Sequence, residues 1–149
     1  MRTLVVALLL LLGAPAQAAP PKPSVSEYFR STNAGFAMSA EGGVQYAVSF
    51  AVLKHLSSPG YVTVLFENTS GKGEPTRKVL VLPPGATELS VKSDRITAIG
   101  NGKRYEVQVN LYEDEERTRL LGKHKQQVEF AIPSAVVAQL SKQFSVDIR

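Results

Sequence analysis

Residues 105–112 read YEVQVNLY, with apolar side chains at Tyr105 and at every second position after it. Successive side chains of a β-strand point to opposite faces, so this period of two predicts a strand with one buried and one solvent-facing side. The same alternation runs through residues 44–52 and 128–132, and shorter apolar segments lie at 35–38, 62–66, 79–82 and 89–91. We therefore expect about seven short strands.

Turn-forming residues separate these segments. The chain reads SSPG at 57–60, NTSGKGEP at 68–75 and PPG at 83–85. Glycine and proline at such positions end strands and begin turns. Short strands at regular spacing, without long helical patterns between them, indicate an all-β domain that is either a sandwich or a small barrel.

Residues 102–114, GKRYEVQVNLYED, resemble the F strand of immunoglobulin-like and fibronectin type III-like sandwiches. In those folds a tyrosine near the start of this strand directs its hydroxyl group back to the backbone of the preceding turn, and Tyr105 stands in the matching place. The disulfide and the core tryptophan of antibody domains are absent, because the chain has no cysteine and no tryptophan. The resemblance implies a seven-strand antiparallel immunoglobulin-like β-sandwich.

The dipeptide Asn101-Gly102 leaves two topologies open. Asn-Gly is the strongest short hairpin signal, and a hairpin would pair residues 95–99 with the strand that begins at Lys103. In the immunoglobulin-like arrangement the strands on either side of this corner belong to different sheets. We favour the corner.

Residues 134–144 predict a short C-terminal helix. Ser134 is a candidate N-cap, Lys142 lies near the end, and one face carries Val136, Val137, Leu140 and Phe144. The alternative is a final strand, because Val146 and Ile148 also alternate.

Residues 1–18 predict a secretory signal peptide that is cleaved near Ala18. A positive start precedes nine apolar residues from Leu4 to Leu12, and Ala16-Gln17-Ala18 supplies the small residues of a cleavage site. The apolar run is shorter than the roughly 20 residues that span a bilayer, and no cysteine is present to carry a lipid. We expect a soluble periplasmic or secreted product with no stable membrane anchor, made of a Pro-rich spacer at 19–24 and one β-sandwich domain at 25–149.

Charge and residue chemistry argue against several functions. The net charge of +4, or +3 without Arg2, gives no reason to expect nucleic-acid binding. We interpret His55 as a strand-end residue and His124 as a surface residue, because catalysis and zinc binding both need further groups beside a histidine. Residues 113–116, EDEE, are interpreted as a solvated hairpin tip rather than a calcium site, because Arg117 and Arg119 follow at once. We expect no catalytic residue, no metal site and no cofactor.

The predicted strands at 105–112 and 120–132 carry the candidate binding residues. If the two strands pair, their outward side chains form a polar face with one aromatic residue, suited either to a partner or to plain solvation. The candidate partner-binding face consists of Gln108, Asn110, Tyr112, Lys123, Lys125 and Gln127.

The sequence therefore predicts an exported, non-enzymatic binding protein whose partner is an envelope or extracellular protein. Strand edges are part of this hypothesis, because they can recruit a partner strand. Two alternatives stay open: a small-ligand or carbohydrate-binding module, and a hydrolase with an unrecognised serine, histidine and acid around His55 or His124.

Overall fold

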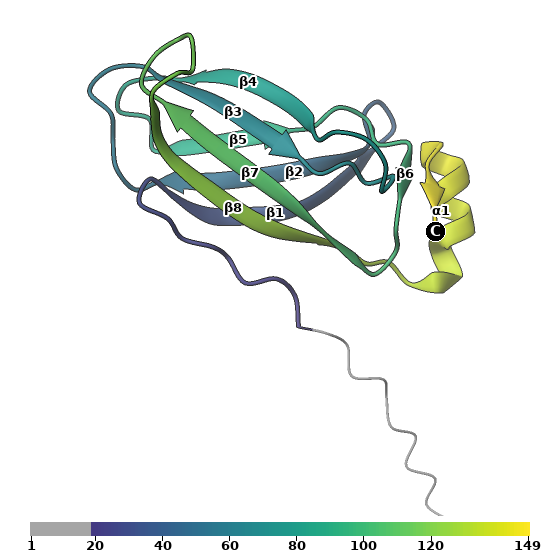
Figure 1. Ribbon diagram of the computed structural model, residues 1–149. Helices are drawn as coiled ribbons and strands as arrows, with labels where there is room; N and C mark the ends of the chain where they lie inside the picture. The colour runs from purple at the N-terminus through teal and green to yellow at the C-terminus, as the bar shows by residue number, and fades with distance from the viewer. Residues whose placement is uncertain (1–18) are drawn as a thin grey trace, which may run out of the picture.

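The computed structural model describes residues 19–149; the predicted signal peptide, residues 1–18, lies outside the described residues (Figure 1). Two antiparallel sheets pack face to face. One has the strand order β1 (Phe29–Ser39), β2 (Gly43–Val52), β5 (Glu88–Lys92), and the other has the order β4 (Thr76–Leu82), β3 (Gly60–Phe66), β7 (Lys103–Tyr112), β8 (Leu120–Phe130). The prediction of an all-β, seven-strand antiparallel sandwich is confirmed.

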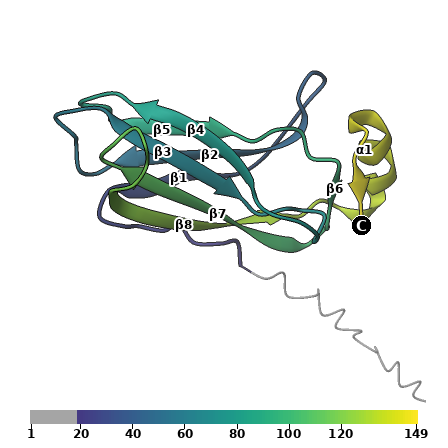
Figure 2. The same cartoon turned by 45° about the horizontal axis from the view of Figure 1, so that its top comes forward.

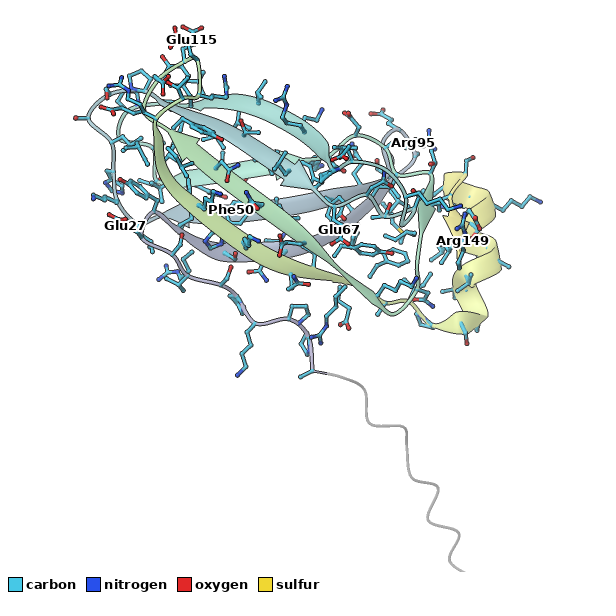
Figure 3. All side chains as sticks on the ribbon, in the orientation of Figure 1. Glu27, Phe50, Glu67, Arg95, Glu115 and Arg149 are labelled. Carbon is cyan, nitrogen blue, oxygen red and sulfur yellow. The ribbon has the colours of Figure 1, made fainter. Side chains whose placement is uncertain are left out.

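The alternation of the sequence decides which side chains form the core. Val107, Val109 and Leu111 of β7 are fully buried, and so are Val44 and Phe50 of β2. Phe50 lies between the two sheets (Figure 3). Burial of each such side chain contributes about 1.5–3 kcal/mol, and this apolar layer stabilises a chain that has no disulfide.

The dipeptide Asn101-Gly102 forms a corner between sheets, so the hairpin alternative is wrong. The short strand β6 (Ala98–Ile99) pairs in parallel with β9 (Asp147–Ile148), whereas β7 pairs with β3 and β8. The Tyr105 hydroxyl oxygen accepts a hydrogen bond from the backbone N–H of Gly100 at 2.7 Å. Tyr105 thus turns its hydroxyl group back to the preceding turn, as the resemblance implied.

The C-terminal segment contains a helix followed by a short strand. A 3₁₀ turn (Ser134–Val136) leads into α1 (Val137–Phe144), and β9 follows. The expectation that Ser134 caps the helix is wrong: Ser134 starts the 3₁₀ turn, and Val136 occupies the N-cap without a side-chain hydrogen bond. Figure 2 shows α1 against one end of the sandwich, where the buried side chain of Phe144 anchors it.

In residues 19–149, no helix combines the length and the apolar character needed to cross a membrane.

Candidate functional site

The six residues of the predicted binding face lie together on the outer face, the side of the β4-β3-β7-β8 sheet that points away from the core. In the β7–β8 pair, Gln108 stands opposite Lys125 and Asn110 stands opposite Lys123. Gln127 lies opposite Glu106, and Tyr112 closes the series at the end of β7. The exception in exposure is Asn110, which is only 7% exposed and accepts a hydrogen bond from the Gln108 side-chain amide at 2.8 Å.

A row of large side chains crosses all four strands at one end of this face. Tyr61 of β3 stands opposite Val81 of β4 on one side and Tyr112 of β7 on the other, and Tyr112 stands opposite Leu120 of β8. We call these four residues the tyrosine row. Val81 and Leu120 are 53% and 45% exposed. Val79, next to the row on β4, is 56% exposed.

Sequence reasoning found only Tyr112 of the tyrosine row. The other members come from β3, β4 and β8, whose lateral order the sequence does not state. The segment 61–65 carried part of the signal: Val62 and Val64 point inward, so Tyr61 and Leu65 point outward. The continuous apolar run at 79–82 did not show which of its side chains face outward.

The turn between β7 and β8 places a cation beside the row. The Arg117 guanidinium lies 6.0 Å from the centre of the Tyr61 ring, within the range of a cation–π interaction. Arg117 Nη1 donates to the Glu115 carbonyl at 3.0 Å, and the residue adopts a left-handed backbone with φ 57°. Figure 3 shows Glu115 at the tip of this turn.

Hydrogen bonds within the turn engage the carboxylate of Asp114. It accepts hydrogen bonds from the Thr118 hydroxyl at 2.6 Å and from the Arg119 backbone N–H at 2.7 Å. These bonds favour the charged form and lower the pKa of Asp114 to about 2. Within residues 19–149, no three His, Cys, Asp or Glu side chains are grouped to hold a metal ion.

Two ion pairs lie on the outer face, on the part of β7 and β8 away from the tyrosine row. Lys125 pairs with Glu106 at 3.2 Å, and Arg104 pairs with Glu129 at 3.5 Å. In the part of the chain that the structure describes, Lys123 and Arg77 make no ion pair. Lys123 stands opposite Asn110, two residues along β7 from Tyr112, whereas Arg77 stands opposite Leu65, four residues along β4 from Val81.

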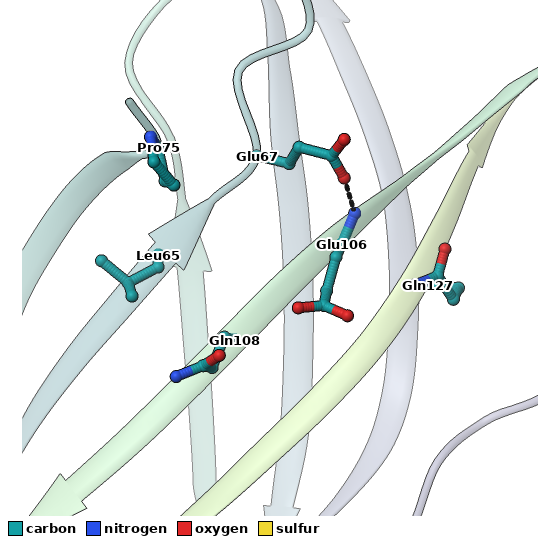
Figure 4. A pocket seen from close by; sticks show the side chains of 6 residues that line it. All are labelled: Leu65, Glu67, Pro75, Glu106, Gln108 and Gln127. Carbon is teal, nitrogen blue, oxygen red and sulfur yellow. Dashed lines mark hydrogen bonds between the residues drawn. The ribbon is translucent and has the colours of Figure 1, made fainter. Parts of the chain in front are cut away.

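A hollow of about 340 Å³ lies on the outer face beside the ion pair of Lys125 and Glu106 (Figure 4). The carboxylate of Glu67 accepts a hydrogen bond from the Glu106 backbone N–H at 2.6 Å and closes one side of it. Its lining contains no aromatic side chain and consists of Leu65, Glu67, Pro75, Glu106, Gln108 and Gln127.

The interpretation of His124 as a surface residue is wrong. Its side chain lies between the sheets and is 2% exposed. Nε2 lies 2.9 Å from the hydroxyl oxygens of Ser24 and Ser31, and Nδ1 lies 2.9 Å from that of Ser26. Burial lowers the pKa of the imidazole, so the neutral ring is favoured. His55, in contrast, is exposed.

The contacts of His124 differ from a Ser-His-acid arrangement. Such an arrangement needs a carboxylate on the second ring nitrogen, and here that nitrogen faces the Ser26 hydroxyl. The Ser24 hydroxyl lies 2.6 Å from the Lys125 carbonyl, to which it can donate its proton. Within residues 19–149, neither histidine has a carboxylate as a hydrogen-bond partner.

His124 and Gln126 bind residues 19–26 to the edge of β8. The side-chain oxygen Oε1 of Gln126 accepts a hydrogen bond from the Ser24 backbone N–H at 2.8 Å, and the side-chain nitrogen Nε2 donates to the Lys22 backbone carbonyl at 3.1 Å. Residues 19–24, predicted as a spacer, contain no strand but lie against the domain.

Comparisons with known proteins leave the family open. No family model and no curated protein matches the chain. Among solved structures, the chain is similar to β-glucuronidase 2 of Bacteroides uniformis, covalently bound to cyclophellitol-6-carboxylate aziridine, with 15% identity and a TM-score of 0.38. The match covers 72% of this chain and 12% of that chain. A likeness this distant assigns no role to any residue.

Proposed function

We propose that this protein is an exported, non-enzymatic binding protein that recognises an envelope or extracellular protein through the tyrosine row. The supporting observation is the row itself: two tyrosines lie between two exposed aliphatic side chains, with the exposed Val79 beside them. Exposed apolar patches with a polar rim are typical of protein interaction sites.

The chemistry around the row describes the surface that would fit it. Tyrosine is enriched at the energetic centre of interfaces, where it buries a large ring and keeps a polar hydroxyl. Charges of both signs surround this centre: Lys123 and Arg117 lie beside the row, and the acidic residues Glu113, Glu115 and Glu116 follow Tyr112 in the turn. A partner with an apolar centre and a rim of mixed charge would be complementary.

The hollow on the outer face is the place for the alternative, a small-ligand or carbohydrate-binding module. Small-molecule pockets are lined mainly by apolar and aromatic side chains. This lining has no aromatic ring and two carboxylates, so we favour the protein partner. Glycan-array binding that is lost in Gln108→Ala and Gln127→Ala, and retained in Tyr61→Ala, would reverse this preference.

Quantitative crosslinked capture from the envelope fraction tests the proposal. We expect Tyr61→Ala and Tyr112→Ala each to reduce recovery of the specific partner about tenfold or more, because central aromatic residues dominate interface energies. Lys123→Ala and Lys125→Ala should reduce it less, because rim charges mainly affect association rates. Lys92→Ala, on the outward side of β5, is the matched control.

Equal recovery with the wild-type protein, Tyr61→Ala and Tyr112→Ala would reject the site. Each variant must unfold at the same denaturant concentration as the wild type, so that loss of capture reports the interface rather than the fold.

A further inference from the structure

The two sheets end in four edge strands, and one of them differs from the rest. Residues 19–26 lie along β8 and β1, where the Ser31 backbone N–H donates to the Ser24 carbonyl at 3.0 Å. β5 has five residues and turns the charged side chains of Glu88 and Lys92 outward. β4 has seven residues and turns Val79 and Val81 outward, each more than half exposed.

An edge strand presents unpaired backbone N–H and C=O groups, which natural proteins protect with charge, shortness or a cover. Along residues 79–82, the outward side of β4 has none of these protections and presents the apolar side chains of Val79 and Val81. Figures 1 and 2 both show β4 as the outermost strand of its sheet. This edge has the properties that favour addition of a further strand.

The charges along β4 specify which segment would fit. On its inner side Lys78 is neutralised by Asp94 at 2.6 Å. On its outer side Arg77, opposite Leu65, has no ion pair within residues 19–149. The outer side therefore presents, in chain order, one uncompensated cation and then Val79 and Val81.

We propose that β4 accepts an extended segment of the partner protein as an additional antiparallel strand. From the N-terminus of that segment, the side chains at three alternate positions are apolar, apolar and acidic. These three side chains face Val81, Val79 and Arg77, respectively. This inference rests on the proposed function, because β4 supplies Val81 to the tyrosine row. A second copy of β4 fits less well: centred on Val79, it would place Val81 opposite Arg77 and leave that charge uncompensated.

The experiment measures fluorescence anisotropy of a labelled peptide, Ser-Val-Thr-Val-Thr-Glu-Ser, with the protein as exported and processed by its expression host. Two further peptides have N-methyl groups on the odd or on the even residues. Alternate residues of a strand direct their N–H groups to opposite edges. We expect one methylated peptide to bind about tenfold or more weakly and the other to bind nearly as the parent does.

A charge exchange tests the register. We expect Arg77→Glu to lower the affinity for the parent peptide about tenfold. The same variant should bind a peptide with Lys in place of Glu more tightly than the wild-type protein does. Lys92→Glu makes the same charge change on β5 and should have no effect.

Equal binding of both methylated peptides, or equal effects of Arg77→Glu and Lys92→Glu, would overturn the strand-addition proposal. So would a dimer in analytical ultracentrifugation that Val81→Lys dissociates. If these peptides fail while envelope capture still depends on Tyr61 and Tyr112, the proposed function stands without strand addition. If capture is independent of both tyrosines, the proposed function itself fails.

Discussion

The two edges of the four-stranded sheet, β8 and β4, contrast in their side chains and in their surroundings. β8 turns His124 and Gln126 inward, each 2% exposed, and residues 19–26 of the chain cover its edge. β4 turns Val79 and Val81 outward, and no segment of residues 19–149 pairs with its edge.

This contrast shows two ways of treating unpaired edges. On β8, side chains make the hydrogen bonds, and a polar side chain buried without a partner would cost about 1–3 kcal/mol. The β8 edge is therefore complementary only to a segment that places serine hydroxyl groups beside the His124 ring. On β4, backbone pairing and apolar contacts are available to any segment with a suitable alternation, as recognition of a separate partner requires.

The largest expected effect is from His124→Ala on the covered edge. Removing the ring opens a cavity beside Phe29 and Phe50 and leaves serine hydroxyls without their partner. We expect the free energy of unfolding to fall by about 3 kcal/mol, measured by urea denaturation. His55→Ala is the control and should change it by less than about 0.5 kcal/mol. A loss below about 1 kcal/mol for His124→Ala would mean that the covered edge is not a fixed part of the fold.

A smaller effect is expected from Ser24→Ala in the covering segment. The Ser24 hydroxyl lies within 2.6–3.2 Å of the Lys125 carbonyl, His124, Gln126 and Ser31. We expect a loss of about 1–2 kcal/mol in urea denaturation, together with faster hydrogen exchange at β8. Ser57→Ala, at an exposed serine in a loop, should leave both measurements unchanged. Unchanged exchange at β8 in Ser24→Ala would contradict the idea that this segment seals the edge.

The fold was largely predictable because its signals are local. The alternation of β2, β7 and β8 lies within single segments, and Tyr105 lies near the start of β7, in the place that the resemblance to immunoglobulin-like sandwiches implied. The corner at Asn101-Gly102 was the harder choice. The hairpin signal of this dipeptide concerns two residues, whereas pairing of β6 with β9 depends on residues nearly 50 positions later.

The site was less predictable because its signals are distant in sequence. His124 shares its alternation phase with the apolar Val128, a signal of burial that the interpretation as a surface residue did not use, and the serines that satisfy it lie about a hundred residues earlier. The tyrosine row needs the lateral order of four strands, which no single segment encodes. Tyr112 could be predicted from its own strand, whereas Val81 and Leu120 could not.

Acid should weaken the covered edge. Burial lowers the pKa of His124 in the folded state below its ordinary value of 6.5. The unfolded chain therefore takes up the proton first as the pH falls, and stability that is fully present above 6.5 is lost as the pH falls toward the folded-state pKa. We expect the urea midpoint of the wild type to fall between pH 7 and pH 5.

The matched variant for this titration is His124→Gln, which keeps hydrogen-bonding groups but does not titrate in this range. The variant should show a flatter dependence of the urea midpoint on pH, although its stability at pH 7 is lower. His55 remains in both proteins and contributes equally. Parallel pH profiles for the two proteins would assign the acid effect to other groups.

The smallest effect on stability is expected at the open edge, from the double variant Val79→Thr and Val81→Thr. Threonine keeps the branched shape and the strand propensity of valine but replaces a methyl group with a hydroxyl group. Because both side chains are more than half exposed, the free energy of unfolding should change by less than about 0.5 kcal/mol. Partner capture should nevertheless fall several-fold, because these side chains would be buried only in the complex. A loss of stability without a loss of capture would show that the two valines serve the fold, and the contrast between the covered and the open edge would then carry no functional meaning.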